Sequence, residues 1–85
     1  MNDKNDIITI DTLTPGQIAT VETVESSPMA GRLKDLGLIS GTSVRCLYRA
    51  PFGDPTAYEI RGAVIALRRA DSRCVLARNG VTSDG

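Results

Sequence analysis

Hydrophobic residues alternate with polar ones over five short stretches of the chain. These stretches are residues 17–25, 44–49, 57–61, 63–68 and 74–78, and they are rich in β-branched side chains. A period of two residues is typical of strands that bury one face. Gly, Pro, Asn or Ser residues separate most of the stretches, as expected for turns. The pattern therefore predicts five short strands joined by tight turns.

The first of these strands contains an irregularity. Its apolar residues Val21 and Val24 lie three positions apart, which breaks the alternation. One extra residue in a strand, a β-bulge, has this effect, so we expect a bulge there. Upstream, Ile7–Ile10 is expected to lie against the domain as a short extended segment, followed by a turn at Leu13–Gly16.

One helix is expected between the first two of these strands. Ser27 is a suitable N-cap residue, and Pro28 suits the first helical position. An apolar stripe with helical spacing follows, formed by Met29, Leu33 and Leu36. Gly37 can adopt the left-handed conformation that ends many helices, with Leu38 folding back onto the stripe. The Leu-Gly-Leu sequence is thus explained by local structure alone.

The alternation also assigns side chains of the later strands to shared faces. We expect the following sets of side chains each to share a face: Val44, Cys46 and Tyr48; Tyr58 and Ile60; Ala63, Ile65 and Leu67; Val75 and Ala77. Residues 70–73 are expected to form a late 3-10 turn. Five strands and one short helix after the first strand predict a mainly β fold, and an SH3-like five-stranded barrel fits this order best.

The length of 85 residues is consistent with a single small domain. The composition is 41% hydrophobic but only 4% aromatic, which predicts an aliphatic core. We place the domain at residues 7–79, between a disordered tail at residues 1–6 and a second tail at residues 80–85. The polar N-terminus resembles no signal peptide and no stretch is apolar enough to span a membrane, so a cytoplasmic location is expected.

The charges are unevenly distributed although the formal net charge is zero. Residues 1–44 carry a net charge of −3 and residues 45–85 a net charge of +3. The arginines of the second half could form a solvated strand face or a patch for an acidic partner. A nucleic-acid-binding barrel, one alternative, would use Arg45, Arg49, Arg61, Arg68, Arg69 and Arg73.

The residue types argue against an enzyme. The chain has no His, which removes the commonest general base and metal ligand. Its two cysteines, Cys46 and Cys74, lack CxxC spacing, and we expect reduced thiols, with Cys46 buried and inert. Asp54 and Glu59 could in principle lie close together, but a small barrel has little room for a cleft. We predict no catalytic residues, no metal ligands and no cofactor.

An ordered set of short motifs runs from Leu13 to Ala77. It comprises Leu13 with Pro15-Gly16, the helix end Arg32–Leu38, the turn Ser40–Thr42, the loop Ala50–Pro55 and Leu67–Arg69. In this order the motifs resemble the FeoA family, small cytosolic proteins that accompany the bacterial ferrous iron transporter FeoB. Two positions depart from the family pattern: Ser40, where Pro is common, and Ser72, where an apolar residue is usual.

The resemblance implies an SH3-like fold. It also implies that the protein docks on the cytosolic GTP-binding region of FeoB and thereby regulates iron uptake. We expect the docking cleft between the helix end and the loop, with Phe52 as an apolar anchor. The partner-binding residues would be Leu36, Gly37, Leu38, Pro51, Phe52, Gly53, Asp54 and Pro55. For Asp54 the alternative is a carboxylate that binds backbone amides of its own turn.

Two alternatives to FeoB docking remain. The same fold forms the C-terminal domain of iron- and manganese-dependent repressors, which suggests a metal-responsive or metal-binding module, such as a sensor or carrier of Fe²⁺. The arginine-rich barrel for nucleic acid is the other. Contact with a membrane is expected only through the transporter, and the edge strands of an open barrel make self-association an option.

Overall fold

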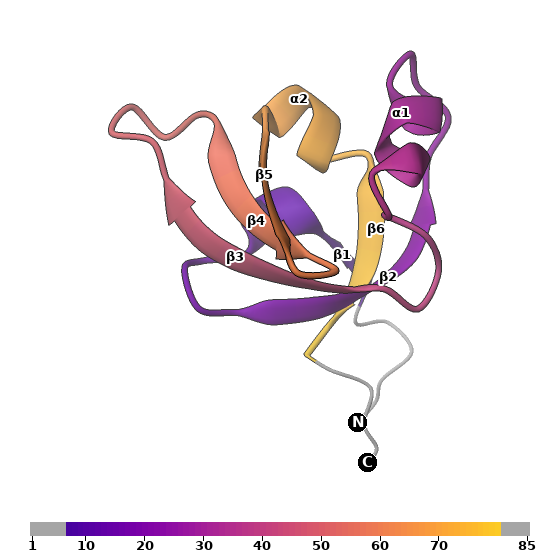
Figure 1. Cartoon of the computed structure of the whole chain (residues 1–85), viewed down its shortest axis with the longest axis horizontal. Helices are drawn as coiled ribbons and strands as arrows, with labels where there is room; N and C mark the ends of the chain where they lie inside the picture. Colours follow the sequence, from indigo (N-terminus) through magenta and orange to yellow (C-terminus); the bar gives the residue numbers. More distant parts are fainter. Residues whose placement is uncertain (1–6, 81–85) are drawn as a thin grey trace.

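Residues 7–80 fold into one strongly curved antiparallel sheet with two short α-helices at its rim (Figure 1). The computed structural model describes residues 7–80. In chain order the elements are β1 (Ile7–Thr9), the 3-10 helix η1 (Ile10–Thr12), β2 (Ile18–Val24), α1 (Ala30–Asp35), β3 (Ser43–Arg49), β4 (Thr56–Ile60), β5 (Ala63–Leu67), α2 (Arg69–Ser72) and β6 (Val75–Asn79). The predicted tails lie outside the described residues, apart from Gly80.

The mainly β prediction is confirmed, with three details corrected. The segment Ile7–Thr9 is a sixth strand, β1, which pairs with β6 at one edge of the sheet. The strand order is β1-β6-β2-β3-β4-β5. The late helical turn, α2, is an α-helix that begins one residue earlier than predicted, and the 3-10 turn is the unpredicted η1 near the N-terminus.

The core lies inside the curved sheet and is largely aliphatic, as predicted. Fully buried members include Val21, Leu33, Leu38, Val44, Ile60, Val75 and Ala77. Tyr58 is the largest of the fully buried side chains, and its hydroxyl donates a hydrogen bond of 3.3 Å to the Ile10 carbonyl. This bond satisfies a polar group that would otherwise be costly to bury. Ser72, a departure from the family pattern, is also buried, and its hydroxyl donates to the Arg69 carbonyl.

The predicted bulge in β2 is confirmed. Val21 pairs with Ala77 and Thr23 pairs with Leu76, so Glu22 is the extra residue. Val21 and Val24 are therefore both buried although they are three positions apart. The bulge explains why this strand departs from a strict two-residue period.

A second bulge, in β3, overturns one predicted face. Cys46 pairs with Tyr58, but Tyr48 pairs with Ala57, which makes Leu47 the extra residue. The inward alternation holds for Cys46 and is lost beyond it. Tyr48, expected to share a face with Val44 and Cys46, is instead 61% exposed.

The helix α1 begins later than expected and is not capped by Ser27. Its N-cap residue is Met29, with no side-chain hydrogen bond to the cap, and the buried Ser27 hydroxyl has no partner among the described residues. Ser27 contributes its backbone carbonyl instead, which accepts from the Ala30 N–H at 3.1 Å. The apolar stripe is confirmed: Leu33 is fully buried, while Met29 and Leu36 pack against the core.

Candidate functional site

The predicted helix end forms a Schellman motif at Gly37. Gly37 has φ +107°, and its N–H donates to the Lys34 carbonyl at 2.9 Å. The Leu38 N–H reaches the Leu33 carbonyl at 3.1 Å. These two bonds satisfy carbonyls that the last helical turn would leave unpaired. The same geometry sends Leu38 into the core.

The helix end therefore offers little apolar surface from its predicted residues. Leu38 is fully buried and Leu36 is half-buried. The accessible apolar residue here is Ile39, which is 47% exposed. Sequence reasoning missed Ile39, although one signal was available: it is apolar, follows the helix end and belongs to no predicted core face.

The predicted loop, in contrast, displays its aromatic residue fully. Phe52 is 98% exposed at the tip of the β3–β4 loop. The loop is closed by two backbone bonds, from Ala50 N–H to the Pro55 carbonyl at 2.9 Å and from Gly53 N–H to the Ala50 carbonyl at 2.7 Å. Gly53 has φ +89°, a conformation that favours glycine. Phe52 is thus presented by an internally bonded turn.

Asp54 fastens this loop to the helix α2. Its Oδ1 accepts a hydrogen bond of 2.9 Å from the Arg69 N–H, at the first residue of α2. A carboxylate is a good acceptor for the unpaired amides of a first helical turn. The interpretation that Asp54 binds amides of its own turn is therefore wrong, because its partner lies 15 positions along the chain.

The two predicted halves of the site do not meet. The residues of the Pro51–Pro55 loop directly precede β4, whereas Gly37 lies beside Ile60 at the other end of that strand. Figure 1 shows the β3–β4 loop and α1 on opposite sides of the molecule. A strand of this length separates its ends by about 13 Å, and the described residues enclose no pocket. The expected cleft between the two segments is therefore wrong.

A second aromatic residue joins Phe52 at this end of the sheet. The Leu47 bulge turns Tyr48 outward near the end of β3, shortly before the loop. Pro51 is exposed as well. We call Tyr48, Pro51 and Phe52 the loop surface. Aromatic residues are enriched among those that dominate binding energy at protein interfaces. Tyr48 was missed because the bulge that exposes it leaves no mark in the sequence.

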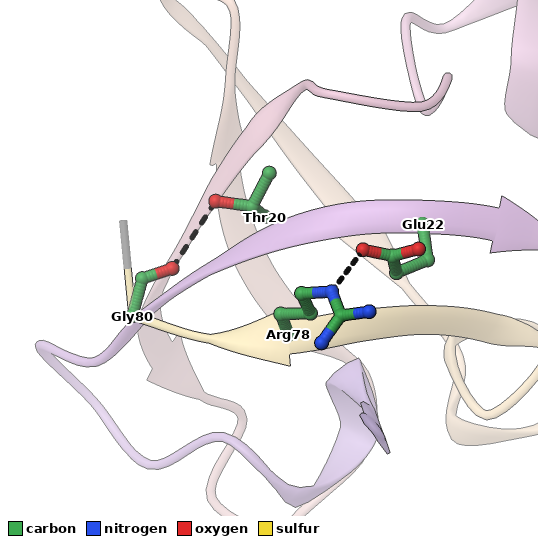
Figure 2. Close-up of polar contacts among 4 residues, drawn as sticks. All are labelled: Thr20, Glu22, Arg78 and Gly80. Atoms are coloured by element: carbon green, nitrogen blue, oxygen red, sulfur yellow. Dashed lines mark hydrogen bonds and ion pairs between the residues drawn. The ribbon is translucent and has the colours of Figure 1, made fainter. Parts of the chain in front are cut away.

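Not every arginine of the second half of the chain is available to a ligand. The half-buried Arg49 donates from Nη2 to the Leu13 carbonyl at 2.7 Å, which ties β3 to the segment after η1. Arg78 forms an ion pair with Glu22, the bulged residue of β2 (Figure 2). Arg49 thus has a structural role and is removed from the predicted nucleic-acid-binding set. The exposed members of that set are Arg45, Arg61, Arg68, Arg69 and Arg73.

Burial keeps the ionisable groups of Cys46 and Tyr58 in their neutral forms. Burial raises the pKa of the Cys46 thiol, although the Arg49 guanidinium opposes the shift. Burial likewise raises the pKa of Tyr58. A thiol with a raised pKa is a poor nucleophile and a poor metal ligand. Among residues 7–80, no three His, Cys, Asp or Glu side chains lie close enough to hold a metal ion, and no helix there is long and apolar enough to cross a membrane.

Comparison with known proteins identifies the relatives of this chain. The FeoA domain family model matches residues 8–79, which is most of the chain. No curated protein matches it in sequence. The solution structure of the FeoA protein from Chlorobium tepidum is 29% identical, with a TM-score of 0.79 over 92% of this chain and 75% of that one.

Two further structures bear on the fold. FeoA from Stenotrophomonas maltophilia, crystallised with zinc and described as a prokaryotic SH3 domain protein, is 25% identical, with a TM-score of 0.77 over 89% of this chain and 99% of that one. A manganese-dependent transcriptional repressor is 17% identical, with a TM-score of 0.77 over 86% of this chain and 36% of the repressor. The predicted SH3-like fold is confirmed, and the likeness to the repressor is one of fold alone.

Proposed function

This chain belongs to the FeoA family, which is associated with ferrous iron transport, and we propose that it is a non-enzymatic accessory protein of the FeoB transporter. In this proposal it acts in the cytoplasm, docks on the GTP-binding region of FeoB and regulates the uptake of Fe²⁺. The S. maltophilia relative has been put forward as a ferrous iron transport activating factor, which agrees with a regulatory role.

The exposure of Phe52 is the observation that carries the proposal. An aromatic side chain that is 98% exposed buries almost no apolar surface in its own domain. Burying it in a partner would release about 2–3 kcal/mol of hydrophobic free energy. Because the loop is closed by backbone bonds and fastened by Asp54, little conformational entropy would be lost on binding. A preorganised aromatic anchor of this kind fits a docking protein.

The helix end has a smaller part in this proposal. The helix end is formed by Leu36, Gly37 and Leu38, and it directs the backbone so that the next residue, Ile39, is exposed. Ile39 is separated from the loop surface by the length of β4. A partner large enough to cover both would have to span that strand, whereas a smaller contact would use the loop surface alone.

A titration of the isotope-labelled protein with the cytosolic GTP-binding region of FeoB tests the proposal. It should be followed by NMR with and without guanine nucleotide. We expect shifts that cluster on the Pro51–Pro55 loop. Phe52→Ala should weaken binding at least tenfold and leave the spectrum of the sheet unchanged, because the side chain contacts almost nothing in the domain.

Ile39→Ala is the matched control, since it truncates an exposed apolar residue at the far end of β4. An effect of Ile39→Ala equal to that of Phe52→Ala would show that the helix end contributes as much as the loop. Full affinity in Phe52→Ala would refute the anchor. If no resonance moves in either nucleotide state, the GTP-binding region is not the docking site.

A further inference from the structure

The strand β5 lies at an open edge of the sheet. It pairs with β4 on one side, and within the described residues no strand pairs with the other side. Its sequence, Ala63–Leu67, contains no charged residue and no proline. Exposed edges are normally protected by charges, prolines or bulges, because their free backbone groups attract other strands. The residues of β5 provide none of these protections.

The geometry of the hairpin turn before β5 determines which backbone groups of β5 are free. Arg61 and Gly62 form the two-residue turn, with φ of +53° and +84°, as in a type I′ turn. The residues that flank such a turn, Ile60 and Ala63, form a hydrogen-bonded pair, and the pairs then alternate along the ladder. It follows that Val64 and Ala66 direct their N–H and C=O groups away from β4.

The side chains of these two residues are accessible as well. Val64 is 61% exposed, and Ala66 is also exposed. Their neighbour Ile65 is half-buried, on the inward face. An incoming strand would therefore meet two outward backbone pairs and a small apolar face.

Exposed arginines stand at both ends of this edge. Arg61 lies in the turn before β5, and Arg68 and Arg69 follow its last residue. In antiparallel pairing of two copies of the chain centred on Ile65, Arg61 of one copy would face Arg69 of the other. Like charges directly opposite each other are destabilising. The charge pattern argues against a second copy as the occupant and favours a strand with acidic ends.

We propose that β5 accepts an extended segment of the partner protein as a seventh strand of the sheet. The segment would be about five residues long to match β5, with a small apolar middle and Asp or Glu at both ends. Main-chain bonds to Val64 and Ala66 would supply affinity, and the arginines would select the segment by charge. This inference rests on the proposed function, because FeoB would supply the strand.

The base of the Pro51–Pro55 loop adjoins the end of β5. Thr56, directly after the loop, pairs with Leu67 at the end of β5. The bond from Arg69 N–H to Asp54 fastens the loop at the same place. A partner that buries Phe52 is therefore positioned to extend a segment along β5, starting from its Arg68 end.

Amide hydrogen exchange of the full chain, with and without the GTP-binding region of FeoB, tests this inference directly. In the complex the Val64 and Ala66 amides should exchange at least tenfold more slowly. The Ile65 amide, which already faces β4, should change little. Binding without protection at residues 64 and 66 would refute the added strand but not the docking. If the GTP-binding region does not bind at all, both the docking proposal and this inference are overturned.

A proline substitution offers a second readout. Ala66→Pro removes an outward N–H that the β4 ladder does not use, and proline is tolerated on edge strands in this orientation. Ala66→Thr keeps the N–H and suits a strand. We expect Ala66→Pro to weaken binding at least tenfold and Ala66→Thr to bind as the wild type does. Equal affinity of the two variants would overturn the inference, as would protection of residues 64 and 66 that rises with the concentration of this chain alone.

A charge-reversal variant distinguishes an acidic segment of FeoB from a second copy of this chain as the strand that pairs with β5. Arg68→Glu should weaken binding of the GTP-binding region severalfold. Self-association through β5 would instead be strengthened, because the repulsion at its ends would fall. A gain in dimerisation without loss of partner binding would therefore refute the acidic-ended strand.

Discussion

The side chain of Arg61 lies directly across Gly37. A Cβ atom at residue 37 would be 2.7 Å from Cδ of Arg61 and 3.5 Å from Cγ2 of Ile60. Both Arg61 and Gly37 have positive φ, +53° and +107°. The end of α1 and the β4–β5 turn are thus fitted together by two residues in left-handed backbone conformations. Position 37 therefore favours glycine for two reasons: the left-handed conformation that ends α1, and the close approach of the Arg61 side chain.

Gly37→Ala should therefore destabilise the fold more than a comparable substitution elsewhere. Gly41→Ala is the control, because Gly41 has φ +91° but no atom within 4 Å of the added Cβ. Each variant should lose about 1–2 kcal/mol from backbone strain. Gly37→Ala should lose about 0.5–1.5 kcal/mol more, because the added Cβ would force the Arg61 side chain to shift. Urea denaturation measures both values, and the excess should vanish in an Arg61→Gly background.

The Gly37 cap shows what the sequence could and could not predict. The cap depends on bonds within a few residues, so Leu36-Gly37-Leu38 was sufficient to predict it. The contact with Arg61 joins positions 24 apart in sequence and depends on the curvature of the whole sheet. The β2 bulge was predictable because Val21 and Val24 break the alternation, whereas the β3 bulge was not, since Tyr48 suits either face.

The candidate site was likewise predictable from the sequence only in part. The loop was identified from its prolines, Gly53 and the resemblance to FeoA, and Phe52 is exposed there. The cleft with the helix end failed because it required a distance between segments that flank opposite ends of β4. The β5 edge was not identified as a site because strand order, unlike strand position, cannot be read from alternation alone.

Asp54→Ala should loosen the loop without unfolding the sheet. It removes the acceptor for the Arg69 N–H at the start of α2. Loss of a side chain that caps a helix costs about 0.5–2 kcal/mol. We expect a drop in Tm, faster exchange of the Arg69 amide and increased backbone motion at Phe52 in relaxation measurements. Asp54→Asn keeps an oxygen acceptor and should retain most of the wild-type behaviour; an equal loss in both variants would contradict a role for the hydrogen bond.

The ion pair of Glu22 with Arg78 should add little to stability. It links the bulged residue of β2 to β6, beside the hydrogen bond of 3.2 Å from the Thr20 hydroxyl to the Gly80 carbonyl (Figure 2). Their side chains are 37% and 44% exposed, so water screens the pair. A double-mutant cycle with Glu22→Gln and Arg78→Gln should give a coupling of about 0.2–1 kcal/mol. The coupling should shrink in 1 M salt; a value that ignores salt would contradict a screened pair.

Stability should fall at alkaline pH because two buried acids, Cys46 and Tyr58, are held neutral. Burial raises the folded-state pKa of Cys46 above its ordinary value of 9.0 and that of Tyr58 above 10.0. Above pH 9.0 the unfolded chain therefore loses protons that the folded chain keeps, which favours unfolding. Below that pH both states are protonated at these groups, and the penalty is absent.

The two groups can be separated by the slope of Tm against pH. Cys46→Ala should flatten the decline that begins near pH 9.0, and Tyr58→Phe should flatten the part above pH 10.0. Each substitution also lowers Tm at neutral pH, through a small cavity at residue 46 or the lost bond to the Ile10 carbonyl. The slope is therefore the informative quantity. A decline of the same slope in the double variant would show that other groups cause the alkaline unfolding, and that the burial of these two acids is not linked to it.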